Sequence, residues 1–179
     1  MPFSFLPLLL LLTGAPAPAD PFIDHLSAKA AGGGVSVRFS LVNAFRSEET
    51  VKALQNGLPT SFTYVIEMYR DRPNWFDGGA GRARIEVIAT FNAVTREYLL
   101  NYRRDRKLVR SETFSDLESL ERRMTTIDEH ALFGIGRHKP HKLRVRVKAD
   151  LRRGWLWYVI PWNFSTRWKV VRVVAENGR

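Results

Sequence analysis

The sequence predicts a mainly β fold, a single antiparallel β-sandwich of immunoglobulin-like architecture that carries two short helices. About seven or eight segments alternate apolar and polar residues with a period of two, which is typical of strands with one buried face. Turn residues separate these segments, and the chain lacks the repeated strand–helix pattern that a parallel sheet requires. A partly open barrel is the alternative architecture that the same pattern allows.

The first half of the chain is expected to form four of these strands and one helix. Gly32-Gly33-Gly34 turns the chain between the first two strands, because no helix follows these glycines to make them a phosphate cradle. Ser47 is placed to cap a helix that Gly57 ends. Asp77-Gly78-Gly79 predicts a turn before the fourth strand. The strands are expected over residues 22–30, 35–42, 61–71 and 82–92.

The second half is expected to add the remaining strands and the second helix. Ser115 is placed to cap this helix. Its apolar residues recur at helical spacing and are Leu117, Leu120, Met124 and Ile127. The consecutive residues Asp128-Glu129-His130 that follow are interpreted as a solvated loop. The strands are expected over residues 97–103, 107–114, 142–151 and 168–174.

Residues 1–19 have the composition of a secretory signal peptide, which leaves residues 20–179 as one domain. Phe3–Leu12 is apolar, and Ala17 and Ala19 supply the small side chains that signal peptidase requires. We expect cleavage after Ala19 and a periplasmic or secreted protein. Cleavage after Ala17 is an alternative, and so is an uncleaved segment, because the leader lacks Lys and Arg.

The composition excludes several kinds of site and partner. The chain has 28 Lys and Arg against 18 Asp and Glu, a formal net charge of +10, and no cysteine. Disulfides, thiolate metal sites and cysteine nucleophiles are therefore excluded. A basic surface attracts many polyanions, but an exported domain meets lipid, glycan and acidic proteins first, so we expect no nucleic-acid partner.

Catalytic and metal-binding motifs are not recognisable in the sequence. His138-Lys139-Pro140-His141 has a ligand-like spacing, but its proline prevents a regular helix and the adjacent lysines repel a divalent cation. We therefore expect a protein without enzymatic activity, metal or cofactor. The alternative is an enzyme that modifies an envelope polymer, with unidentified acid/base residues for which Glu67, Asp128 and Glu129 are candidates.

Basic residues concentrate in two segments. Arg144, Arg146 and Lys148 alternate with apolar residues in an expected strand, so their side chains lie on one face. A second concentration lies within residues 103–110. If the two strands are neighbours, they form one positive surface that attracts an anionic partner. The alternative is an edge strand that its charges protect from aggregation.

Aromatic residues crowd between residues 155 and 168, beside Arg152 and Arg153. Rings flanked by arginines are suited to stacking on a sugar or a peptide, or to a membrane interface. The alternative is that several of these rings cover one end of the core. The candidate binding residues from both features are Arg144, Arg146, Lys148, Arg152, Arg153, Trp155, Trp157 and Trp162.

Several short segments form a distinctive set, which is Leu41-Val42-Asn43-Ala44-Phe45, Ala53-Leu54, Gly57-Leu58-Pro59, Phe62-Thr63-Tyr64, Ile66-Glu67, Tyr69-Arg70 and Trp75-Phe76-Asp77. Together they resemble the uncharacterised bacterial domain-of-unknown-function family 4390. The resemblance implies a proteobacterial exported protein and brings no assigned activity, cofactor or catalytic residue. It also implies genes that lie near a membrane sensor kinase, which makes such a kinase a candidate partner.

Glu67 stands out among these segments because its neighbours are apolar. We expect it to be partly buried and paired with an arginine such as Arg82 or Arg84 on the following strand. Taken together, the sequence predicts a non-catalytic exported binding or accessory module. It is expected to act as a monomer on an anionic lipid, a glycan, or an envelope or membrane-associated protein.

Overall fold

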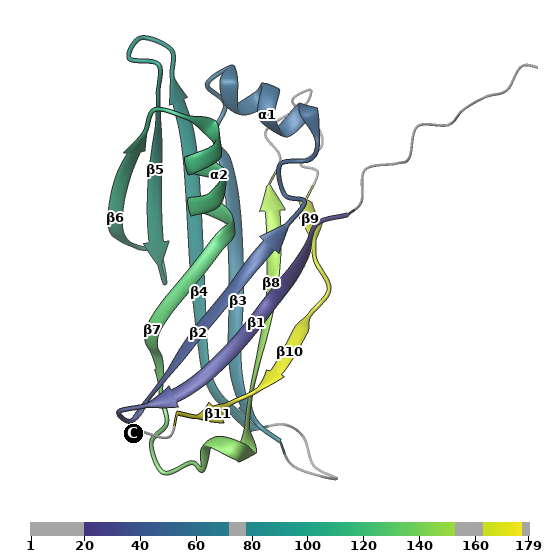
Figure 1. Cartoon of the computed structure of the whole chain (residues 1–179), viewed down its shortest axis with the longest axis vertical. Coiled ribbons are helices and arrows are strands. Elements are labelled where there is room, and N and C mark those ends of the chain that lie inside the picture. The colour runs from purple at the N-terminus through teal and green to yellow at the C-terminus, as the bar shows by residue number, and fades with distance from the viewer. Residues whose placement is uncertain (1–19, 72–77, 153–162, 177–179) are drawn as a thin grey trace, which may run out of the picture.

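The computed structural model describes residues 20–71, 78–152 and 163–176, which form two packed sheets (Figure 1). Sheet A contains, in spatial order, β11 (Val174–Ala175), β1 (Phe22–Ala31), β2 (Gly34–Val42) and β7 (Thr126–Gly134). Sheet B contains β10 (Lys169–Arg172), β8 (Leu143–Arg152), β3 (Thr60–Arg70), β4 (Gly78–Asn92), β5 (Glu97–Arg104) and β6 (Lys107–Phe114), with β9 (Asn163–Ser165) also paired to β8. The predicted mainly β sandwich is confirmed, and its strand pairs are antiparallel except for β1 with β11.

The core lies between the inner faces of the two sheets. The buried residues alternate along the strands as predicted and include Val35, Val37, Phe39 and Leu41 on β2, Phe62, Tyr64, Ile66 and Met68 on β3, and Leu143, Val145, Val147 and Ala149 on β8. Phe39 of sheet A meets Tyr64 of sheet B edge to face, with ring centroids 5.2 Å apart. The Tyr64 hydroxyl donates to the Met124 carbonyl at 2.7 Å, which satisfies this buried polar group.

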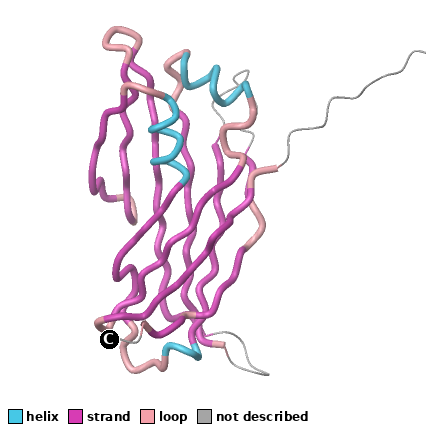
Figure 2. The backbone as a smooth tube through the Cα atoms, in the orientation of Figure 1, coloured by secondary structure: helices cyan, strands magenta, loops and turns pink. Residues whose placement is uncertain are grey.

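The two sheets are joined along both sides of the sandwich. On one side the chain passes from β10 in sheet B to β11 in sheet A through Val173, which is buried. On the other side α2 (Leu117–Thr125) carries the chain from β6 to β7 and buries Leu120 and Met124. Figure 2 shows strands along most of the length of the molecule, with several of the connections at its two ends. Helix α1 (Glu48–Gln55) lies at one end and the 3₁₀ turn η1 (Pro140–Lys142) at the other (Figure 1).

The region of α2 differs from the prediction in three ways. The N-cap is Asp116 and not Ser115, since the Asp116 side chain accepts a hydrogen bond from the Ser119 amide at 2.7 Å. The helix ends at Thr125, so the predicted helical residue Ile127 lies in β7, where it pairs with Phe39. The predicted loop at residues 128–130 is likewise part of β7. Pairing with β2 therefore overrides the helical spacing of the apolar residues.

Two strand boundaries also differ from the prediction. Gly78 and Gly79 pair with Arg70 and Tyr69, so they begin β4 instead of forming a turn. The single strand predicted over residues 168–174 divides at Val173 into β10 and β11, because the chain changes sheets there. By contrast, Gly57 ends α1 as predicted, with a φ of 78° that glycine adopts without strain.

Candidate functional site

The three candidate cations of β8 lie on the outer face of sheet B. Leu143, Val145 and Val147 point into the core, and Arg144, Arg146 and Lys148 alternate with them on the opposite face, as predicted. The cross-strand register adds further basic residues to this face. Its cations are Arg82 and Arg84 on β4, Arg103 on β5, Arg144, Arg146 and Lys148 on β8, and Arg172 on β10.

Each of the three predicted cations has an acidic partner. Arg146 Nε donates to Glu67 Oε2 at 2.8 Å, and Arg144 Nε donates to Asp71 Oδ2 at 2.8 Å. Lys148 Nζ lies 3.2 Å from Asp150 Oδ1. The two arginine pairs connect β8 to β3 and to the residue that follows β3, and the lysine pair lies within β8. The positive charge of β8 is therefore partly neutralised by its neighbours.

Glu67 is partly buried and paired with arginine, as the sequence predicted. Its Oε1 lies 3.6 Å from Arg82 Nε, which was an expected partner. Its closer partner, Arg146, was not predicted, because only the pairing of β3 with β8 brings them together. Glu67 thus holds a guanidinium from each flanking strand.

On this face Glu67 and Glu86 lie deeper than the arginines that they bind, whereas Asp71 and Asp150 are slightly more exposed than Arg144 and Lys148. The Glu67 side chain is 20% exposed, compared with 71% for Arg82 and 41% for Arg146. Glu86 and its partner Arg103 show the same order, 24% against 46%. The acids of the face are Glu67, Asp71, Glu86 and Asp150. They are outnumbered by the cations, so solvent meets a net positive surface.

An aromatic row crosses the same face. The Arg146 guanidinium lies 4.7 Å from the Trp168 ring centroid and 5.4 Å from that of Tyr69. Lys148 Nζ lies 5.6 Å from the Trp168 ring. Such contacts contribute about 0.5–1 kcal/mol each at exposed sites. Trp168 is 38% exposed. Its ring therefore contacts these cations and still presents a surface that a ligand can reach.

Part of the predicted aromatic site lies outside the described residues. Arg153, Trp155, Trp157 and Trp162 belong to this group, as do residues 1–19 of the predicted leader and Trp75-Phe76-Asp77. For Arg152 the structure places the backbone in β8.

The structure contradicts the edge-strand alternative for β8 and does not meet the condition that the two basic strands are neighbours. Strand β8 lies between β3 and β10, so the charges of β8 do not protect a sheet edge. Strands β3 and β4 separate β8 from β5, so the basic segment at residues 103–110 does not adjoin β8. Arg104 and Arg110 of that segment instead contact Glu129 and the Tyr102 ring between the sheets. Arg103 of that segment shares the outer face of sheet B with the β8 cations, so the two basic segments form one surface only in part.

The three acids considered for catalysis lie on three different surfaces. Glu67 is on the outer face of sheet B, and Asp128 is on sheet A, where Arg38 Nε donates to it at 3.0 Å. That hydrogen bond lowers the pKa of Asp128 below its ordinary value. Glu129 lies between the sheets and accepts a hydrogen bond from Tyr102. This arrangement does not supply a pair of carboxylates for acid/base catalysis.

A groove of about 480 Å³ lies between the β2–α1 connection and α2. Glu118 and Glu121 of α2 line it opposite Arg46. Burial, and then the charge of Glu118, raise the pKa of Glu121 above its ordinary value. The sequence did not single out Glu121, because its depth depends on how α2 packs across the sandwich. A single carboxyl of raised pKa does not define a reaction.

In the part of the chain that the structure describes, His, Asp and Glu side chains do not gather in threes around a position for a metal ion. The helices within the same residues are too short or too polar to cross a membrane.

Comparison with known proteins finds one family model, described as a domain of unknown function (DUF4390), which matches residues 20–172. The match covers both sheets up to the end of β10. No curated protein and no solved structure matches the chain.

Proposed function

Because the chain belongs to the DUF4390 family, whose domain has no known function, we propose its role from its own surface. It is a non-catalytic binding or accessory module of the cell envelope. The outer face of sheet B contacts an anionic envelope component or partner protein there.

The depth of Glu67 and Glu86 on that face carries the proposal. Glu67 and Glu86 lie beneath the guanidinium groups that they bind, so a partner that approaches the sheet meets the cations first. Long-range attraction between such a surface and an anion increases the rate of encounter and weakens with salt. The Trp168 ring beside Arg146 adds a contact that an apolar or sugar surface can share.

Two observations support a role in binding over a role in catalysis. The acids Glu67, Asp128 and Glu129 are separated, and each is held by an arginine. The cations of the outer face, in contrast, are spread over several strands of sheet B. Such a spread suits an extended partner better than a small substrate, which requires a concave site.

The composition of residues 1–19 supports export, and export determines which anions the protein meets. In the envelope these are acidic phospholipids, glycans and acidic proteins, including the extracytoplasmic parts of membrane proteins such as a sensor kinase. The protein acts as a monomer in this proposal, with the sheet face turned towards its partner.

The test compares two pairs of substitutions that remove equal charge. Arg82→Gln with Arg84→Gln removes two exposed cations of the sheet B face and leaves the Arg146–Glu67 pair in place. Lys29→Gln with Arg38→Gln removes two exposed cations from sheet A. Binding of the full chain to washed bacterial envelopes is measured across a series of NaCl concentrations.

The sheet B variant is expected to lose most of its salt-sensitive envelope binding, whereas the sheet A variant binds like the unchanged protein. Equal binding by the two variants would show that the sheet B face is not the contact. Circular dichroism and thermal unfolding confirm that both variants are folded.

A further inference from the structure

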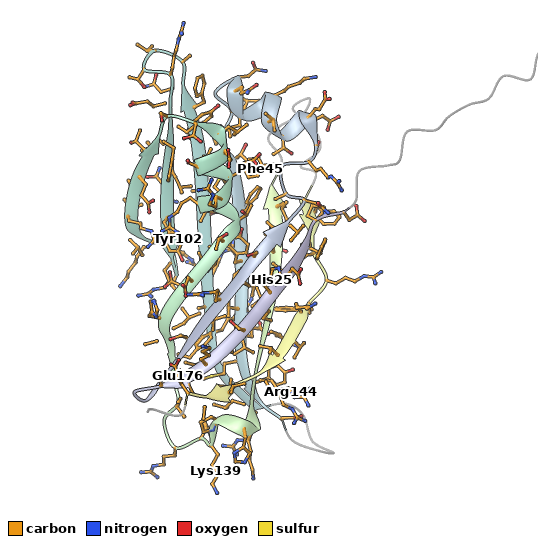
Figure 3. All side chains as sticks on the ribbon, viewed as in Figure 1. His25, Phe45, Tyr102, Lys139, Arg144 and Glu176 are labelled. Carbon is orange, nitrogen blue, oxygen red and sulfur yellow. The ribbon has the colours of Figure 1, made fainter. Side chains whose placement is uncertain are left out.

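The connection between β7 and β8 forms a separate basic tip at one end of the molecule. Arg137, Lys139 and Lys142 are exposed there, and we call these three residues the basic tip. Figure 3 places Lys139 at the lower extremity of the molecule, beyond Arg144 and at the end away from Phe45. The tip therefore lies at one end of the long axis, whereas the outer face of sheet B extends along the side of the molecule.

The tip is built from two successive turns anchored in the core. The His138 amide donates to the Ile135 carbonyl at 3.1 Å, and the Lys142 amide donates to the Lys139 carbonyl at 3.0 Å. Ile135 packs against the core, and Leu143 is fully buried. Because the backbone is held at both ends, binding a ligand orders little more than the basic side chains.

The charges of the tip remain available, in contrast to those of β8. Within the described residues, no acid lies within ion-pair distance of Arg137, Lys139 or Lys142. Two acids lie at this end: Asp71 is bound to Arg144, and Glu176 lies 3.6 Å from Lys29. Arg70 contributes a further cation, because Arg70 Nη2 bonds to the His138 ring at 2.7 Å and not to a carboxylate.

We propose that the basic tip binds the surface of an anionic phospholipid bilayer. A convex end can present all three cations to a plane, and both the lysine ammonium groups and the planar guanidinium of Arg137 bind headgroup phosphates. Val174 on β11, which lies against η1, is 62% exposed and adds an apolar contact at the same end. This attachment goes beyond the proposed role of the sheet B face, which it leaves accessible.

The backbone of the tip does not favour an extended acidic peptide. The amides of Ile135, His138 and Lys142 are already bonded, to Gly33, Ile135 and Lys139, so they do not offer a ladder to an added strand. Phospholipid headgroups need no such ladder, since they are recognised by charge.

The test uses the full chain and two triple variants of equal net charge. The tip variant is Arg137→Gln, Lys139→Gln and Lys142→Gln. The control is Lys52→Gln, Lys107→Gln and Arg122→Gln, which removes exposed cations far from the tip in α1, β6 and α2. Sedimentation measures partitioning onto vesicles of phosphatidylglycerol with phosphatidylcholine and onto vesicles of phosphatidylcholine alone. The latter report any contribution from residues 1–19, which all forms share.

The tip variant is expected to lose about a hundredfold in partitioning onto the anionic vesicles, because each basic residue near such a surface contributes about fivefold. The control is expected to stay within about threefold of the unchanged protein. High NaCl should remove the difference between the two triple variants.

Four results would overturn the inference. The first is equal partitioning of the tip variant and the control. The second is no gain in binding when phosphatidylglycerol is added. The third is tighter retention of the protein on immobilised polyglutamate than on anionic vesicles, which would assign the tip to an acidic polypeptide. If only the Arg82→Gln and Arg84→Gln variant loses vesicle binding, the sheet B face is the lipid contact and the tip is not.

Discussion

Tyr102 of β5 donates a hydrogen bond to Glu129 of β7 at 2.6 Å and so connects the two sheets at one side of the sandwich. Arg104 bonds to the other oxygen of Glu129 at 3.2 Å. The Arg110 guanidinium lies 4.1 Å from the centre of the Tyr102 ring. Burial and the bond to Glu129 raise the pKa of Tyr102 well above its ordinary value, so its hydroxyl stays a donor. Glu129 therefore accepts two hydrogen bonds between the sheets, which indicates a structural role for this carboxylate.

Tyr102→Phe tests this connection. The change removes the donor to Glu129, whose side chain is only 12% exposed, and we expect it to lower the free energy of unfolding by about 1–2 kcal/mol. Tyr98→Phe on the same strand is the control, because the Tyr98 hydroxyl makes no hydrogen bond to another described residue. Urea unfolding provides the measurement. Equal losses in the two variants would contradict the role given to the Tyr102 hydroxyl.

The Arg146–Glu67 pair is expected to stabilise the fold more than a fully exposed ion pair. A double-mutant cycle of Arg146→Met and Glu67→Gln should give a coupling energy of about 1 kcal/mol, since Glu67 is partly withdrawn from solvent. The same cycle on Glu48 and Lys52 of α1 should give about 0.3–0.5 kcal/mol. If the coupling energy of Arg146 with Glu67 is no larger than that of the α1 pair, the partial burial of Glu67 does not strengthen the ion pair.

Asp116 and Ser115 distinguish the observed helix cap from the one that the sequence predicted. Asp116→Ala removes the bond from the Ser119 amide and should lower the midpoint of thermal unfolding, whereas Ser115→Ala should change it little. Thermal unfolding of the two variants measures the difference. A greater loss of thermal stability for Ser115→Ala than for Asp116→Ala would show that Ser115 caps the helix, as the sequence predicted.

Asp128 makes stability depend on pH in the acidic range. Its pKa is lowered in the folded protein, first by the hydrogen bond from Arg38, so the folded state resists its protonation. The stabilisation is present above the ordinary pKa of an aspartate and is lost as the pH falls through the lowered folded-state pKa. In Arg38→Gln, urea midpoints should therefore fall less steeply on acidification. A slope identical to that of the unchanged protein would contradict this contribution.

Strand β7 shows why part of the fold was not predictable. Along β7 only Ile127 and Phe133 are buried, and Ala131 has a φ of 48°. A register shift at the same point breaks the pairing with β2. These irregularities remove the period-two signal on which strand prediction depends, so residues 128–130 resembled a loop.

The candidate surface was predictable only in part. The alternation of Arg144, Arg146 and Lys148 with apolar residues places them on one face, because successive side chains of any strand point in opposite directions. The partners of Arg144 and Arg146 could not be inferred, since Asp71 is 73 positions from Arg144 and Glu67 is 79 from Arg146. Sheet register alone brings them within hydrogen-bonding distance.

By itself, the sequence determined the β-sandwich class, the inward faces of β2, β3 and β8, and the excess of basic residues. These properties depend on local periodicity and composition, which a single chain displays directly. The tertiary structure alone decided that β8 is an interior strand, that Glu67 and Glu86 lie deeper than their arginines on sheet B, and that three cations without an acidic partner among the described residues project at the tip. Each of these depends on which strands pair and in what register, and long-range packing sets that order.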